Sequence, residues 1–259
     1  GVVVACDDPD WIGRRVVGEI NLACRRCDWC DRGLARHCPT RTVLGIRHKD
    51  GCFAEYVTMP LANLHVVPEG IADERAVFVE PLAAAFEVAE QIELSRHTDA
   101  LVLGDGKLGL LTAMVLQARG LDVTIAGRHE RKRALARSFG AQTIDAQAVP
   151  ERAYDLVVEA TGDPAGLALA LRAIEPRGTV VLKSTFHGSA PLVTTPIVVD
   201  EITVVGSRCG PFAPAIAALR DGAIDPWPLV DGSYTLADAP LALARAASPG
   251  VLKVLLDLR

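Results

Sequence analysis

Long apolar runs are absent from this 259-residue chain: no stretch is apolar enough to cross a bilayer, and no segment at its start has the pattern of a signal peptide. An excess of positive charge is absent as well, because 27 Lys and Arg face 32 Asp and Glu, for a formal net charge of −5. This balance argues against a general role at nucleic acids or membrane surfaces. We therefore expect a cytoplasmic protein with neither kind of partner.

Fixed-period repeats and low-complexity linkers are also missing. The length allows two domains, and a composition of 50% hydrophobic and 23% charged residues is typical of an ordinary globular protein. What the sequence does contain is a cluster of cysteines. Seven are present, and four of them fall within fifteen residues. These four are Cys24, Cys27, Cys30 and Cys38.

The spacing of the four cysteines, with gaps of two, two and seven residues, brings consecutive thiolates toward one point. Four thiolates with no open position suit a closed, tetrahedral, structural zinc site. A disulfide pair, free core cysteines or an iron–sulfur cluster are the alternatives. The other three, Cys6, Cys52 and Cys209, are scattered, which favours a reducing compartment and metal chemistry over a disulfide framework.

A glycine-rich turn follows a short apolar run at residues 99–103 and precedes a helical pattern that ends near residue 118. Glycines placed between a strand and a helix let the backbone approach a pyrophosphate at the helix N-terminus. A tight turn of any α/β protein is the alternative. We expect the dinucleotide to be held by Gly104, Asp105, Gly106, Lys107, Leu108 and Gly109.

The next strand, residues 122–126, ends without the carboxylate that a NAD-preferring site places there for the ribose 2′-hydroxyl. Gly127 and Arg128 stand in its place. A missing carboxylate followed by an arginine favours a 2′-phosphate, so we predict that NADP is preferred, with NAD possible. The alternative is that Arg128 is a solvated charge at the start of the next helix.

Further apolar strands alternate with helical segments, which predicts an α/β fold with a doubly wound parallel sheet. Short β segments are expected in the first 67 residues, and the tail is expected to pack back on that region. The predicted strands of the sheet are 155–162, 178–182 and 202–206, with a helix at 164–174. The other predicted segments are strands at 1–5, 16–17, 53–57 and 251–258 and a helix at 237–247.

Together these motifs resemble the zinc-containing medium-chain dehydrogenase/reductase superfamily, the relatives of alcohol, sorbitol and threonine dehydrogenases. The resemblance rests on the cysteine lobe, on the glycine turn and on the segments 51–56, 79–82 and 155–162, the last of which contains Thr161. It implies a Rossmann domain, with Thr161 at the cofactor, and a GroES-like domain that is incomplete at its N-terminus. It also implies a homodimer or homotetramer. The implied domains are 1–82 with a zinc lobe at 21–42, then 83–211, and 212–259 returning to the first.

The resemblance also implies a catalytic zinc that acts on an alcohol or carbonyl substrate while hydride passes to or from the nicotinamide. The family ligands are a Cys, a His-Glu pair after Gly, and a later acidic or Cys residue, which Glu80 matches here. A helix-capping role is the alternative for Glu80. The six histidines are isolated, and none forms a ligand pair. The family's Gly-His-Glu would stand just before residue 1.

We therefore expect a zinc-dependent oxidoreductase whose chain, as given, lacks two catalytic ligands and is inactive. A non-catalytic, nucleotide-binding relative with a structural zinc is the main alternative. A nucleic-acid zinc module is a weaker one, because only the arginines near the cysteines support it against the overall acidity.

Overall fold

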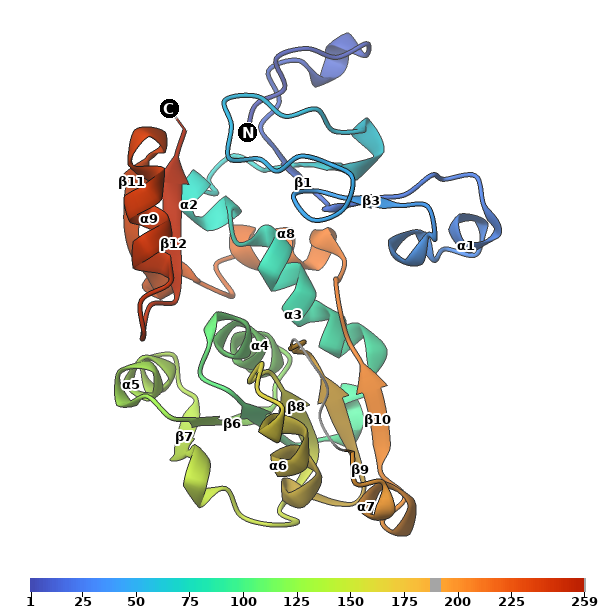
Figure 1. The fold of residues 1–259 in the computed structure, drawn as a ribbon, viewed down its shortest axis with the longest axis vertical. Helices are drawn as coiled ribbons and strands as arrows, with labels where there is room; N and C mark the ends of the chain where they lie inside the picture. Colours follow the sequence, from blue (N-terminus) through green and yellow to red (C-terminus); the bar gives the residue numbers. More distant parts are fainter. Residues whose placement is uncertain (187–191, 259) are drawn as a thin grey trace. The chain divides into compact units, whose positions relative to one another are not determined.

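The computed structural model describes residues 1–186 and 192–258 and divides into two units (Figure 1). The sheet unit comprises Pro81–Pro211 and Ala223–Leu229, and the cysteine unit comprises Gly1–Glu80, Phe212–Gly222 and Val230–Arg259. Each unit thus collects segments that are distant in the sequence. The assignment of functional domains to 1–82, 83–211 and 212–259 stays a prediction.

The sheet unit is built on six parallel strands in the order β10-β9-β8-β5-β6-β7. From β5 the chain proceeds outward through β6 and β7, and then returns to the other side of β5 for β8, β9 and β10 (Figure 1). This order confirms the predicted doubly wound α/β fold. The strands are β5 Asp99–Leu103, β6 Asp122–Gly127, β7 Gln142–Asp145, β8 Tyr154–Glu159, β9 Ile174–Leu182 and β10 Thr203–Gly206.

Helices connect consecutive strands of this sheet, except that only a 3-10 turn at Ala146–Ala148 lies between β7 and β8. A parallel pair needs such a crossover. The core of the unit lies where α4, Lys107–Ala118, packs on β5 and β6. Residues 100–103 of β5 and 110–113 of α4 are all fully buried. Such continuous apolar runs are typical of strands that are covered on both faces. The helices are α3 Val79–Gln91, α4 Lys107–Ala118, α5 Glu130–Ser138, α6 Ala165–Ala173 and α7 Thr195–Val199.

The cysteine unit contains three two-stranded pairings: β1 with β4 and β2 with β3 are antiparallel, and β11 with β12 is parallel. Its C-terminal segments pack on the first 80 residues. The rings of His65 and Phe212 lie 5.0 Å apart, and the Lys253 ammonium lies 5.8 Å from the centre of the Phe78 ring. The strands are β1 Val16–Gly18, β2 Asn21–Leu22, β3 Thr42–Val43, β4 Leu64–Val66, β11 Val230–Thr235 and β12 Lys253–Asp257. The helices are α1 Asp28–Asp31, α2 Asp73–Ala76, α8 Phe212–Arg220 and α9 Ala239–Ala246.

One predicted strand of the cysteine unit is wrong, and the strand predicted at residues 1–5 is only partly formed. Residues 53–57 form no strand, and Phe53 and Tyr56 are 66% and 76% exposed. In the first five residues Val2 forms a single bridge with Arg15, and the backbones of Gly1 and Val3 form hydrogen bonds with residues 13–16, so pairing stops after residue 3. Alternating apolar residues become a strand only when a partner completes the hydrogen-bond ladder, and sequence alone does not say whether a partner is present.

Close packing at Gly210 gives a test of this fold. A Cβ added there would overlap the carbonyl oxygen of Ala83 in α3, whereas one added at Gly206 would meet nothing within 4 Å. We expect Gly210→Ala to lower the free energy of unfolding by about 1–3 kcal/mol, since the backbone must shift. Gly206→Ala is the matched control, and urea unfolding measures both. Equal stability of the two variants would contradict the packing at Gly210.

Candidate functional site

The four predicted zinc ligands lie together. Their Sγ atoms all fall within 4.8 Å of one another. The distances are 3.6 Å for Cys27–Cys30 and Cys24–Cys38, 3.9 Å for Cys27–Cys38 and 4.0 Å for Cys24–Cys30. Zinc–sulfur bonds of about 2.3 Å in a tetrahedron require sulfurs about 3.8 Å apart. All four cysteines are free thiols, and their arrangement fits one zinc ion.

Local backbone geometry explains why this spacing converges. Arg25 has a positive φ of 56°, which turns the chain between the first two cysteines. The short helix α1 begins directly after Cys27 and carries Cys30 on its first turn. Gly33, with φ of 77°, ends this turn and leads to a 3-10 turn at Ala35–His37 that delivers the buried Cys38. The shape of the lobe thus depends on two residues with a left-handed backbone conformation, Arg25 and Gly33, and on two short helical turns.

The electrostatics of the lobe also suit a cation. The Thr40 hydroxyl lowers the pKa of the Cys38 thiol to about 6, and the backbone N–H of Arg26 lowers the pKa of Cys24. The pKa of Cys27 is raised to about 11, because desolvation and three neighbouring thiols outweigh a backbone hydrogen bond from Cys30. Thiols this close cannot all ionise without a positive charge among them. Binding of zinc would supply that charge and release the remaining protons.

The glycine turn lies at the carboxyl end of β5, as predicted. Gly104 has φ of 112°, and a Cβ there would lie 2.7 Å from the carbonyl oxygen of Ala160. A Cβ on Gly109 would overlap the carbonyl oxygen of Gly104. A Cβ on Gly106, by contrast, would meet nothing within 4 Å. Packing within the chain therefore requires two of these glycines and leaves open space at Gly106.

That open space lies at the N-terminus of α4, whose N-cap is Gly106 and has no side-chain capping bond. The first N–H groups of a helix lack carbonyl partners within the helix, and the helix dipole makes this end positive. Lys107 begins the helix and adds a charge of the same sign. The turn fits a pyrophosphate, because it offers donors, positive potential and room beside Gly106.

Arg128 follows the end of β6 and is largely solvent-exposed, with 69% of its side chain accessible. Its Nη1 lies 3.7 Å from Oδ2 of Asp163, which precedes α6. Sequence reasoning named Asp105 as part of the glycine turn and did not foresee that its carboxylate lies at the end of β6. The buried carboxylate of Asp105 lies against Gly127 and accepts the backbone N–H of His129 at 2.7 Å. A carboxylate is thus present at the end of β6, although the strand itself does not carry it.

Thr161 belongs to a partly buried polar network at the carboxyl ends of β8 and β9. Oε1 of Glu159 accepts the Thr161 N–H at 2.7 Å and its hydroxyl at 2.5 Å, and Oε2 accepts the Ser184 hydroxyl at 2.5 Å. Nearby, Nζ of Lys183 donates to the Ser207 hydroxyl at 3.0 Å. Sequence reasoning named Thr161 alone. Glu159 is the last residue of β8, and Lys183 directly follows β9. A charged residue at the end of an otherwise apolar strand is the sequence signal that indicates both.

Glu80 lies in the first turn of α3, which begins at Val79, and is half-buried. Of the residues that the structure describes, only the four cysteines form a group of three or more potential metal ligands. Glu80 is outside that group, and so is each histidine within the described ranges, while His187 lies outside those ranges. The role of Glu80 as a catalytic ligand stays a prediction.

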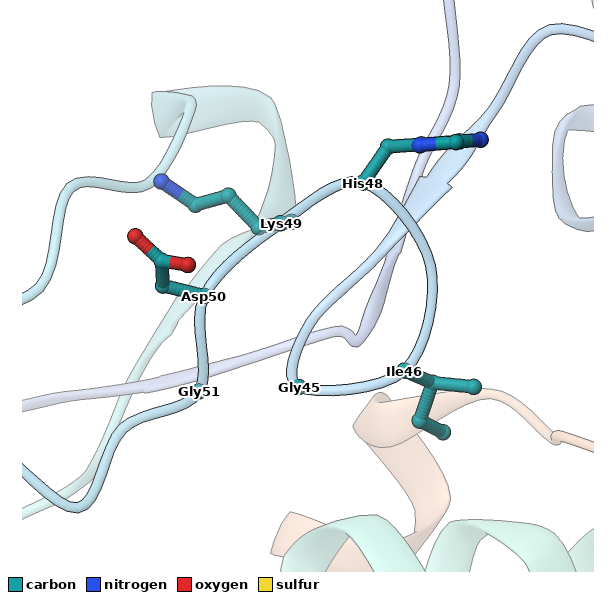
Figure 2. Close-up of a pocket in the computed structure, with 6 residues that line it drawn as sticks. All are labelled: Gly45, Ile46, His48, Lys49, Asp50 and Gly51. Carbon is teal, nitrogen blue, oxygen red and sulfur yellow. The ribbon is translucent and has the colours of Figure 1, made fainter.

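A cavity of about 540 Å³ lies in the cysteine unit and contains none of the predicted site residues. It is formed by one loop, in which Lys49 and Asp50 project to one side and Ile46 to the other (Figure 2). Lys49 donates from Nζ to the Thr58 hydroxyl at 2.8 Å. The lining residues are Gly45, Ile46, His48, Lys49, Asp50 and Gly51. Because one exposed loop forms it, we do not assign it to the candidate site.

Comparisons with known proteins agree with this geometry. Residues 73–221, more than half of the chain, match the family model described as glucose dehydrogenase C-terminus, and residues 1–69 match the alcohol dehydrogenase GroES-like domain. L-threonine 3-dehydrogenase of Streptomyces avermitilis is 31% identical, over 95% of this chain and 75% of its own length. D-arabinitol dehydrogenase 1 of Uromyces fabae is 29% identical, over 94% and 74%.

Solved structures show the same fold. A protein of Sinorhizobium meliloti 1021, described as a zinc-binding dehydrogenase bound to NADP, is 27% identical with a TM-score of 0.90. That match covers 100% of this chain and 81% of the other. The Escherichia coli CFT073 alcohol dehydrogenase rspB, complexed with NADH, is 26% identical with a TM-score of 0.91, over 100% and 82% of the two chains.

The fold and the glycine turn define a Rossmann-type dehydrogenase. More particularly, the chain belongs to the zinc-containing medium-chain dehydrogenase/reductase superfamily, as an alcohol dehydrogenase-type enzyme with a GroES-like domain. The sequence-based assignment to this superfamily is confirmed. No helix among the described residues is long and apolar enough to span a membrane.

The cysteine lobe predicts the metal content of the purified protein. We expect about one zinc per chain that resists mild chelation, and Cys38→Ser to abolish it, because three thiolates cannot close the tetrahedron. Cys52→Ser is the control, since Cys52 is exposed and lies outside the cluster. Elemental analysis and thermal unfolding measure the outcome. Zinc retained at full occupancy in Cys38→Ser would contradict this assignment.

Proposed function

We propose that this protein is a zinc-dependent oxidoreductase that transfers hydride between an alcohol or polyol-type substrate, or the corresponding carbonyl, and a nicotinamide cofactor. The open space at Gly106 beside an uncapped helix N-terminus carries the proposal, because packing within the chain does not require a glycine there. Relatives named as dehydrogenases of arabinitol, sorbitol and threonine support the substrate class.

In this proposal the residues of the sheet unit bind and orient the cofactor. The backbone from Gly104 to Gly109 holds the pyrophosphate at the start of α4. Arg128 pairs with a 2′-phosphate on the adenosine ribose, so NADP is preferred. The Glu159 carboxylate accepts two hydrogen bonds from Thr161 and so holds it at the carboxyl end of β8, where Thr161 forms one wall of the cofactor site. Rigid placement of this kind is what hydride transfer requires of the protein.

Zinc would have two roles. The four-cysteine lobe holds a structural ion. A second, catalytic zinc would lower the pKa of the substrate alcohol, and Glu80 is the residue that would ligate it. Catalytic zinc sites use three protein ligands with one open position. No Cys or His within the described residues completes such a set with Glu80. We therefore propose that residues 1–259 alone are inactive.

The lack of a complete ligand set around Glu80 within the described residues also favours a second candidate function, a non-catalytic relative that binds the nucleotide and one structural zinc.

We further propose a homodimer or homotetramer. In the described part of the sheet, β10 is an edge strand with only β9 beside it, and Val204 is 39% exposed. Edge strands of this kind can pair with another chain.

The free thiols support a reducing compartment, and we propose the cytoplasm. We propose neither nucleic acid nor membrane as a partner.

Arg128 tests the choice of cofactor. We expect NADPH to bind more tightly than NADH, and Arg128→Asp to narrow or reverse this preference. A charge-assisted contact of about 1.5–3 kcal/mol corresponds to roughly ten- to a hundredfold in affinity. Arg131→Asp, which makes the same charge change within α5, should leave the ratio near its original value. Calorimetric titration measures it, and equal affinity for both cofactors in the unmodified chain would refute the preference.

The second zinc is tested by metal content together with turnover. We expect residues 1–259 to hold one tight zinc, to bind NADPH and to show no detectable alcohol oxidation, because Glu80 and solvent alone give weak coordination. Retained NADPH binding is the control for an intact nucleotide site. Two tight zincs per chain, or turnover at ordinary dehydrogenase rates, would show that other residues complete the catalytic site.

A further inference from the structure

Asp105 is the second residue of the glycine turn, and its carboxylate does not face its own strand. It reaches across to the end of the neighbouring strand β6. Its Oδ2 accepts the His129 N–H at 2.7 Å, and Nδ1 of the His129 ring lies 3.1 Å from both carboxylate oxygens. The residue is 7% exposed. The backbone N–H and the ring of His129 thus hold the buried Asp105 carboxylate in a fixed position at the carboxyl end of β6.

Gly127, the last residue of β6, shows which space this carboxylate occupies. A Cβ built on Gly127 would lie 2.6 Å from both Cβ and Oδ2 of Asp105. The space in which a strand-end side chain would begin is therefore filled by Asp105. In dinucleotide-binding folds a carboxylate at this strand end accepts the 2′-hydroxyl of the adenosine ribose. Here the group comes from the preceding turn, and glycine at 127 is needed to admit it.

We propose that Asp105 determines specificity at the adenosine ribose, as the carboxylate that replaces the one missing from β6. This inference rests on the proposed function, because it assumes that a nicotinamide dinucleotide binds here. An ionised carboxylate has about four acceptor sites, and the two His129 donors leave capacity for a ribose hydroxyl. A 2′-phosphate, by contrast, brings negative charge toward a buried negative charge, which opposes its binding.

Asp105 and Arg128 then act in opposite directions on the same ribose. Arg128 favours the 2′-phosphate, and its exposed side chain can approach from solvent, whereas the buried Asp105 favours the 2′-hydroxyl. The preference for NADP is consequently limited by Asp105. Another role for Asp105 is a structural one, in which it only fixes His129 and the start of α5. The two roles differ in one measurable respect: a structural role affects both cofactors equally.

The test uses adenosine fragments, which report on this ribose without the nicotinamide. Binding of 5′-AMP and of 2′,5′-ADP to the full chain is measured by calorimetry for the unmodified protein and for Asp105→Asn. We expect the variant to lose affinity for 5′-AMP and gain affinity for 2′,5′-ADP, so that their affinity ratio shifts at least about tenfold. Asn keeps the size of the side chain and removes its charge. Asp105→Ser provides a second neutral variant should the amide disturb folding.

His129→Ala separates the two roles, since it removes the imidazole contact and keeps the carboxylate. We expect it not to move the ratio toward 2′,5′-ADP. Equal losses for both fragments in Asp105→Asn and Asp105→Ser, or the same ratio shift in His129→Ala, would overturn the specificity role while the proposed function stands. Failure of the unmodified chain to bind either fragment would overturn the proposed function and this inference with it.

Discussion

The close approach of backbone segments at the carboxyl end of β5 is the constraint on which the rest of the sheet unit depends. Gly104 lies against the carbonyl of Ala160, the residue that follows β8, and Gly109 lies against the carbonyl of Gly104. No side chain fits at either position. The first turn of α4 is therefore fixed directly over the point where the strand order reverses, which is where open α/β sheets bind their ligands.

This constraint gathers polar side chains at one edge of the sheet. Parallel strands end on the same side, so the residues that follow β5, β6 and β8 meet there. Asp105, Arg128 and Thr161 come from these three positions. Glu159 and Lys183 are buried charged residues at the same edge, and each forms hydrogen bonds to side chains, as burial of a charge requires. The apolar core stabilises the sheet, and the polar side chains at this edge are the ones to which we assign cofactor binding.

The cysteine lobe depends on a different physical principle. Its segments are short, and within the described residues its secondary structure amounts to the four-residue helix α1, a 3-10 turn and two-residue strands. Such a small element buries too little apolar surface to be stable alone. The four sulfurs lie at tetrahedral spacing, and the zinc that we propose there would supply the remaining stability. If the lobe holds the proposed zinc, metal binding and folding of this lobe would be one process.

The sequence alone determined those features that depend on local spacing. The cysteines at 24, 27, 30 and 38 converge because gaps of two residues constrain neighbouring sulfurs. The strand–turn–helix at residues 99–118 follows from an apolar run, glycines and helical periodicity, and its strand bounds agree with those predicted. Assignment to the family followed from these local motifs taken in order.

Only the tertiary structure decided features that depend on a partner distant in the sequence. Residues 53–57 have a strand-like pattern and form no strand, because β structure requires a neighbour to complete its hydrogen bonds. No carboxylate residue ends β6 in the sequence. The structure nevertheless places the Asp105 carboxylate there, 22 residues before Gly127, where it accepts the backbone N–H of His129. Side-chain reach between neighbouring strands cannot be read from one strand alone. The sequence determined which groups are present, and the packing of β5 against β6 determined which of them meet.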